Sequence, residues 1–138
     1  LFMKTRFPFC TWSMQQLVHL LAKELAKRAA GEGLVLPVLL QVNVGREAQK
    51  SGVLPEAVEE LVEAVRAHES LALRGLMTVP PADEDPRPHF RRLRELAEAH
   101  ALPELSMGMS GDLEVAVEEG ATMVRVGTAI FGPRPSPA

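Results

Sequence analysis

The chain has 138 residues, a length that suits a single domain. It is 46% hydrophobic and 24% charged, so it can bury a core and does not belong to the disordered class. Fifteen basic and eighteen acidic residues give a net charge of −3, which offers no electrostatic reason to expect a nucleic acid or an acidic membrane as partner.

Cysteine content and the absence of long apolar runs indicate a cytoplasmic setting. The single cysteine, Cys10, cannot form an internal disulfide, which favours a reducing compartment, and we assign it no functional role. No apolar run approaches the ~20 residues that a membrane span requires. Residues 1–9 are too short and too interrupted by charge and proline for a signal peptide. Because the sequence begins with Leu1 instead of Met, we expect a partial record.

The first predicted helix begins after Ser13. Ser13 and Gln16 form the pattern of a capping box, in which each side chain binds the other residue's backbone amide. Leucines follow at helical spacing and predict one apolar face, and Gly31 and Gly33 end the helix. The residues of that predicted face are Leu17, Val18, Leu21, Ala22, Leu25 and Ala29.

The segment 36–44 is a compact apolar run, typical of a buried parallel strand. Alternation places Leu39, Gln41 and Asn43 on one face and aliphatic residues on the other. Because the first face becomes polar toward its C-terminal end, we expect a site there.

Helices and strands alternate through the rest of the chain. Pro55 opens a helix that buries Val58, Leu61, Val62 and Val65. Residues 71–79 form the next strand, and Asp83, Glu84 and Asp85 suit the positive N-terminus of a helix that buries Phe90, Leu93 and Ala97. The arginines on that helix, Arg91, Arg92 and Arg94, are interpreted as a solvated face. A strand at 105–110, a helix at 112–119 and a strand at 122–126 follow, before a proline-rich tail at 133–138 that we expect to be mobile.

This order predicts an α/β fold with a parallel sheet and right-handed crossovers. Four strands are half of an eight-stranded (β/α)8 barrel. A half-barrel exposes two unpaired edges, so the chain is expected either to have its missing half in the natural protein or to associate through those edges.

Two segments at the C-terminal ends of the last strands suit a phosphate group. The Gly127-Thr128 turn opens a short helix, and glycine lets the backbone approach an anion. The hydroxyls of Ser110 and Thr128 can each donate a hydrogen bond. Alternation points Arg125 into the barrel, where its charge needs a ligand or an acidic partner. A glycine–threonine turn and a structural arginine are also common features of proteins without any such ligand.

The blocks LPVLLQVNV with Lys50-Ser51-Gly52, RGLMTVPP and LSMGMSGDLEVAVEEGATMVRVGTAIFG resemble the pyridoxal-phosphate (PLP) homeostasis family, YggS/PROSC-type proteins. The resemblance covers about residues 17–132, leaving 1–16 as a divergent N-terminal segment. It implies the partial barrel of the alanine racemase N-terminal type, about the last four strands with their helices. It also implies a cytoplasmic, non-catalytic PLP-binding protein of PLP homeostasis.

Carried over by position, the resemblance implies that Ser110, Gly127 and Thr128 hold the cofactor phosphate and that Arg125 faces the pyridine nitrogen. It further implies cofactor contacts from residues on the earlier strands and their loops, namely Met77, Met107, Asn43 and Lys50, with Gln41 on the same face as Asn43. For Lys50 an ordinary solvated loop lysine is an equal alternative.

The family's Schiff-base lysine, which lies at the end of its first strand, has no counterpart here, so PLP binding is expected to be weak and non-covalent. Lys4 resembles that lysine only superficially. Three alternatives stay open: a racemase-like PLP enzyme, a truncated product without cofactor function, and an unrelated phosphate-binding barrel. The chain contains no tyrosine, the residue that serves as base in the racemase relative.

Overall fold

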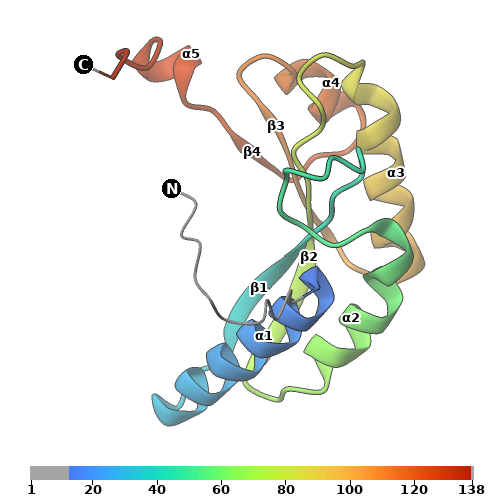
Figure 1. Cartoon of the computed structure of the whole chain (residues 1–138), viewed down its shortest axis with the longest axis vertical. Coiled ribbons are helices and arrows are strands. Elements are labelled where there is room, and N and C mark those ends of the chain that lie inside the picture. The colour runs from blue at the N-terminus through green and yellow to red at the C-terminus, as the bar shows by residue number, and fades with distance from the viewer. Residues whose placement is uncertain (1–12, 138) are drawn as a thin grey trace, which may run out of the picture.

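The computed structural model describes residues 13–137 as helices and strands in alternation (Figure 1). Lys4 and Cys10, which the sequence analysis considered, lie outside these residues. The elements are α1 (Met14–Gly31), β1 (Leu36–Gln41), a 3-10 turn η1 (Pro55–Ala57), α2 (Val58–Arg66), β2 (Leu71–Met77), α3 (Pro86–Ala99), β3 (Glu104–Met109), α4 (Leu113–Glu118), β4 (Met123–Arg125) and α5 (Thr128–Phe131).

The sheet confirms the predicted α/β class. Its four strands are all parallel and lie in the order β1-β2-β3-β4. Helices α2, α3 and α4 lie along one face of the sheet, as Figure 1 shows. A parallel sheet with sequential order and helices on one face is the arrangement of a partial barrel.

Strands β1, β2 and β4 are shorter than predicted, most clearly β1, whose pairing with β2 ends at Gln41, whereas β3 has the predicted length and begins one residue earlier. Beyond Gln41 the chain forms a loop that brings Val53 beside Val42, and these two residues form an isolated parallel bridge. The Val53 amide donates to the Gln41 carbonyl oxygen at 2.9 Å, and the Asn43 amide donates to the Val53 carbonyl oxygen at 2.8 Å. The loop 43–53 therefore covers the C-terminal end of the β1 edge.

The capping box at the start of α1 is confirmed, with the Ser13 amide 2.8 Å from Gln16 Oε1 and the Gln16 amide 3.2 Å from Ser13 Oγ. The predicted apolar face is only partly correct. The buried residues are the alanines, Ala22, Ala26 and Ala29, whose small side chains let the helix lie close to the sheet. Leu17 and Leu21 remain 46% and 59% exposed.

The main core lies between the sheet and helices α2 and α3. All four residues of the stripe predicted for α2 are buried, as are Phe90, Leu93 and Ala97 of α3. The largest side chains with full burial are Phe90, Leu61, Leu76, Leu93 and Met107. The Asp85 side chain caps α3, accepting from the Arg87 amide at 3.0 Å, which agrees with the acidic start predicted for this helix.

The arginines of α3 are not simply a solvated face, contrary to the prediction. Arg87, Arg91 and Arg94 bind the carboxylate of Glu119 at 2.8, 3.1 and 3.2 Å, and the Glu119 side chain is only 5% exposed. These hydrogen bonds, first from Arg91 and then from Arg87, hold the pKa of Glu119 below its ordinary value. Because Glu119 follows α4 directly, the cluster ties α4 to α3.

Candidate functional site at the C-terminal ends of the strands

Four of the predicted site residues lie together at the end of β4. Ser110, Arg125, Gly127 and Thr128 line one open hollow of about 580 Å³. Ser110 follows β3, Arg125 ends β4, and Gly127 and Thr128 form the turn into α5. The parallel order brings these segments side by side because β3 and β4 are neighbours.

Arg125 reaches across the end of β3 to β2. Its Nη2 donates to the Thr78 carbonyl oxygen at 2.8 Å, so the partner is a neutral carbonyl and not the acidic group that the sequence left open. Its Nε is buried and makes no hydrogen bond within the described residues. A buried donor without an acceptor is costly, and here it belongs to a guanidinium at the edge of the hollow.

Ser110 has a defined place in the turn. Its Oγ accepts a hydrogen bond from the Ala129 amide at 3.0 Å, which connects the end of β3 to the first turn of α5. A hydroxyl that accepts one hydrogen bond still has its own proton to donate. Gly127 is the N-cap of α5 and offers no side-chain cap to the amides that follow it.

Lys50 is held in place and is not an ordinary solvated loop lysine. Its Nζ donates to the Pro80 carbonyl oxygen at 2.9 Å and lies 2.6 Å from Glu47 Oε2. The Lys50 side chain is 29% exposed. It therefore lies over the C-terminal end of β2, at the same end of the strands as the β4 turn.

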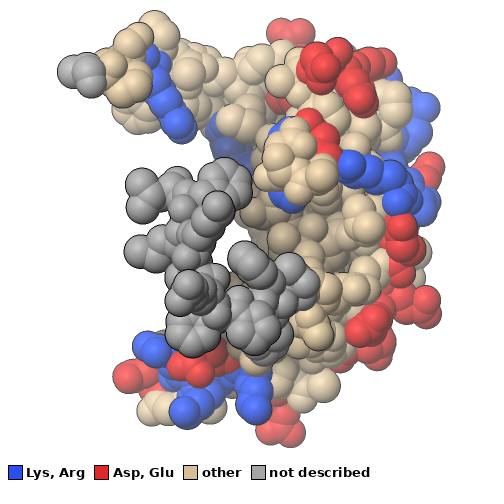
Figure 2. Space-filling model, viewed as in Figure 1, with Lys and Arg blue, Asp and Glu red and all other residues tan. Residues whose placement is uncertain are grey.

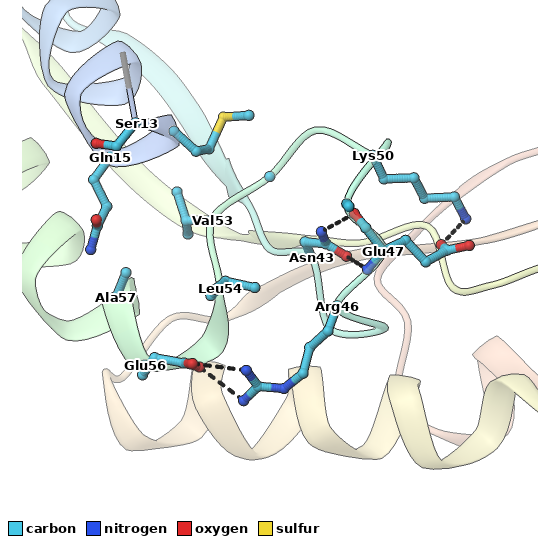
Figure 3. Close-up of a pocket in the computed structure, with 13 residues that line it drawn as sticks. Ser13, Gln15, Asn43, Arg46, Glu47, Lys50, Val53, Leu54, Glu56 and Ala57 are labelled. Atoms are coloured by element: carbon cyan, nitrogen blue, oxygen red, sulfur yellow. Dashed lines mark hydrogen bonds and ion pairs between the residues drawn. The ribbon is translucent and has the colours of Figure 1, made fainter. Parts of the chain in front are cut away.

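Asn43 organises the loop that carries Lys50. Its Nδ2 donates to the Glu47 carbonyl oxygen at 2.8 Å, and its Oδ1 accepts from the Glu47 amide at 3.1 Å (Figure 3). Both ends of the Asn43 amide are therefore used inside the loop. Gln41, on the same predicted face, donates to the Ser51 carbonyl oxygen at 3.2 Å, so it too supports this loop.

Asn43 and Lys50 line a second hollow, of about 500 Å³, between the start of α1, this loop and η1 (Figure 3). A bidentate pair closes one side of it, with Arg46 Nη1 and Nη2 at 2.8 and 2.9 Å from the two carboxylate oxygens of Glu56. The hydrogen bonds from Arg46 lower the pKa of Glu56. The structure thus separates Asn43 from the hollow at the end of β4.

The structure contradicts the predicted lining role for Met107 and does not contradict the one for Met77. Met107 is fully buried in the apolar core, and Met77 is half-buried at the end of β2. Met109, which the sequence reading passed over, is 45% exposed and lines the hollow at the end of β4. The cause is Gly108, whose φ of +101° breaks the strand alternation between the two methionines. In the sequence, the glycine between the two methionines of SMGMS was the feature that could have indicated this break in the alternation.

Across residues 13–137 no group of three or more His, Cys, Asp or Glu side chains is placed to hold a metal ion. No helix in the same range is both long and apolar enough to cross a bilayer.

Comparison with known proteins places this geometry in a family. The model of the alanine racemase N-terminal domain matches residues 9–135, and so begins earlier than the resemblance seen in the sequence. The pyridoxal phosphate homeostasis protein of Aquifex aeolicus is 51% identical over 123 residues, covering 83% of this chain and 54% of that protein. The protein of the same name from Pseudomonas aeruginosa is 55% identical over 104 residues, covering 72% and 45%.

Among solved structures, PipY of Synechococcus elongatus with PLP bound superposes with a TM-score of 0.70 at 28% identity, covering 86% of this chain and 65% of PipY. The chain therefore belongs to the alanine racemase N-terminal domain family, and its four parallel strands form part of that family's α/β barrel. Within this family it is a member of the pyridoxal phosphate homeostasis proteins. It spans about half the length of the curated relatives it matches.

Proposed function

We propose that this chain binds PLP non-covalently in the hollow at the end of β4 and serves PLP homeostasis without catalysing a reaction. The observation that carries the proposal is the unsatisfied Nε of Arg125, a buried donor beside a glycine turn that opens a helix. PLP carries an anionic phosphate, which suits the glycine turn at the helix start, and a ring nitrogen, which can accept a hydrogen bond from Arg125. The cytoplasmic setting and the assignment of residues 17–132 to the PLP-binding unit are parts of the same proposal.

The phosphate end of the site is formed by the β3 and β4 turns. Ser110 donates its hydroxyl proton while its oxygen accepts from the Ala129 amide. Thr128 supplies a second hydroxyl, and Gly127 lets the phosphate approach the backbone. Hydrogen bonds to a charged group contribute about 1.5–3 kcal/mol each.

Arg125 is proposed to face the pyridine nitrogen. A guanidinium remains protonated at all physiological pH values, so it donates to the nitrogen and leaves that nitrogen without a proton of its own. PLP normally supplies an electron sink for reactions at amino acids, and an unprotonated ring is a weak one. This supports a binding protein in preference to an enzyme, and the absence of tyrosine from all 138 residues counts against a racemase-like role.

The positions of the lysines among residues 13–137 support a non-covalent mode. Lys23 and Lys27 are on α1, on the outer surface of the sheet's helical layer. Lys50 lies at the C-terminal ends of the strands, as the proposed PLP site does, but Glu47 and the Pro80 carbonyl hold its ammonium group. An amine that is not positioned at the reacting carbon loses the advantage of proximity.

The test is a PLP titration of the purified chain, followed by absorbance, with Arg125→Met and Thr128→Val as variants. Both substitutions should weaken binding, Thr128→Val by about 1–3 kcal/mol. The control is Arg92→Met, because Arg92 lies on α3 and contacts Glu95 at 3.5 Å, far from the turn in sequence and in the fold. Equal affinities for all four proteins would reject the site, and no binding by any of them would favour a truncated product without cofactor function.

Borohydride reduction and mass spectrometry test the non-covalent mode. We expect no stoichiometric label. Labelling of Lys50 would show that the Glu47 contact opens to release an amine, whereas labelling of Lys4 would assign a cofactor role to the N-terminal segment. Turnover in a racemase assay would overturn the non-catalytic part of the proposal.

A further inference from the structure

Helix α4 has little apolar surface to hold it against the rest of the fold. Of its six side chains only Ala116 is fully buried, while Val115 packs on the core half-buried and Val117 is 60% exposed. Stabilisation by burial scales with the apolar area removed from water, so this helix gains little from it. A helix of this length also has little stability of its own. Other contacts must therefore fix its position.

The contact of α4 with the sheet is close but narrow. Gly108 of β3 lies against Ala116, and a Cβ atom on Gly108 would come within 2.5 Å of the Ala116 methyl carbon. This packing sets how near α4 approaches β3. A small side chain against a glycine leaves the tilt of the helix undetermined, because few atoms are in contact.

The C-terminal end of α4 is fixed by the arginines of the neighbouring helix α3 (Figure 1). Glu119 directly follows α4, and its buried carboxylate binds Arg87, Arg91 and Arg94. Arg94 Nη1 also donates to the Glu119 carbonyl oxygen at 3.1 Å. Helix α3 is itself anchored in the core by Phe90, which is fully buried. The arginines therefore hold this end of α4 from a rigid support.

The opposite end of α4 carries the turn with Ser110. Asp112, the N-cap of α4, accepts a hydrogen bond from the Met109 amide at 2.6 Å, and its own amide donates to the Met109 carbonyl oxygen at 3.2 Å. Ser110 lies inside this turn and accepts from the Ala129 amide. The helix rises only about 9 Å over six residues, so a tilt at the Glu119 end displaces the turn at the other.

Strand β4 does not depend on α4 in the same way. The Thr122 amide donates to the Leu105 carbonyl oxygen at 3.0 Å, and the Leu105 amide donates to Thr122 Oγ1 at 2.8 Å. At the other end of β4, Arg125 is bound to the Thr78 carbonyl oxygen. Arg125 is therefore held by the sheet, whereas the placement of Ser110 depends on the orientation of α4.

We propose that Glu119 is a positioning residue for the phosphate end of the PLP site. Held by the three arginines, it sets the tilt of α4 and thereby the position of the Ser110 hydroxyl. This inference rests on the proposed function for its ligand, but the coupling of Glu119 to Ser110 is a property of the chain alone. A purely stabilising role for Glu119 would leave Ser110 where it is, and experiment distinguishes the two roles.

The coupling is tested first without a ligand, by proton–nitrogen correlation NMR of the full chain. In Glu119→Ala the amide resonances of Met109 and Ala129 should move, because their acceptors lie in the displaced turn. Those of Leu105 and Thr122 should stay, since the sheet holds these residues. Glu119→Gln keeps an acceptor oxygen and should cause smaller movements; it takes the place of Glu119→Ala if that variant does not fold.

Val62→Ala is the matched control for lost stability. Val62 is fully buried in α2, so its truncation destabilises the core from a different helix. A general loosening of the fold would act alike in Val62→Ala and Glu119→Ala. The positioning role predicts that the resonances of Met109 and Ala129 move only in the Glu119 variant.

Titrations with PLP then test the consequence for binding. Glu119→Ala should weaken PLP binding about tenfold, the loss of one hydrogen bond to a charged group. Pyridoxal, which lacks the phosphate, should bind wild type and variant alike, because Arg125 keeps its place. In a Ser110→Ala background Glu119→Ala should have no further effect, since coupled residues are not additive.

Unmoved resonances of Met109 and Ala129 in a folded Glu119→Ala overturn the inference. So do equal losses of PLP affinity in Glu119→Ala and Val62→Ala, or additive losses from Glu119→Ala and Ser110→Ala. If the wild-type chain binds no PLP, the proposed function fails, and the amide resonances alone decide whether Glu119 positions Ser110.

Discussion

Valine substitutions at Thr78 and Thr128 should separate a hydroxyl that stabilises the fold from one that binds the ligand. The two residues are of the same type, but one is buried and the other is exposed. Thr78 is fully buried, and its Oγ1 donates to the Val42 carbonyl oxygen at 2.7 Å, joining the ends of β1 and β2. Thr78→Val keeps the shape and removes the donor. The lost bond and the poorly solvated carbonyl should together reduce the free energy of unfolding by about 1–3 kcal/mol. For a domain of this size the melting temperature should fall by roughly 4 °C per kcal/mol.

Thr128→Val is the control for that change. The Thr128 side chain is exposed and makes no hydrogen bond in the part of the chain that the structure describes. Its substitution should leave the free energy of unfolding within about 0.5 kcal/mol of the wild type, while weakening PLP binding. Urea denaturation with an unchanged m-value measures the first effect. If Thr128→Val destabilised the fold and Thr78→Val did not, the assignment of the two hydroxyls would be refuted.

Three further outcomes follow from single contacts. Glu119 has a folded pKa below its unfolded value, so its stabilisation is fully present above about pH 4.5 and is lost as the pH falls through the lowered value; Glu119→Gln should flatten an acid titration of stability in this range. Gly75→Ala should destabilise by about 1–3 kcal/mol in chemical denaturation, because the new Cβ would overlap the Glu104 carbonyl group. Phe90→Ala should cost about 3–5 kcal/mol in the same assay, since Phe90 is fully buried.

Local signals in the sequence were sufficient for the order of elements and for individual caps. The Ser13–Gln16 capping box and the Pro55 start are features of a few neighbouring residues, and both appear as predicted. The parallel order of the sheet follows from alternation and crossover handedness. These inferences need no knowledge of distant contacts.

Contacts between distant segments were out of reach of the same reasoning. The role of the α3 arginines depends on Glu119, which directly follows α4 and lies at least 25 residues away in sequence. The position of Met107 depends on the backbone conformation of Gly108. In α1, periodicity identified an apolar surface, but it could not tell that the alanines, and not Leu17 and Leu21, would face the sheet.

The end of β2 connects the two halves of the candidate site. Arg125 binds the carbonyl of Thr78, and Lys50 binds that of Pro80, with Val79 O at 3.5 Å from the Lys50 ammonium. Three consecutive carbonyls thus receive two cations, one from the loop after β1 and one from β4. A carbonyl carries no net charge, so Arg125, which has no carboxylate partner among the described residues, keeps its charge available to an anionic ligand. Lys50, paired with Glu47, does not. The same strand end therefore presents one cation for binding and restrains the other, which is why a non-covalent mode fits this arrangement.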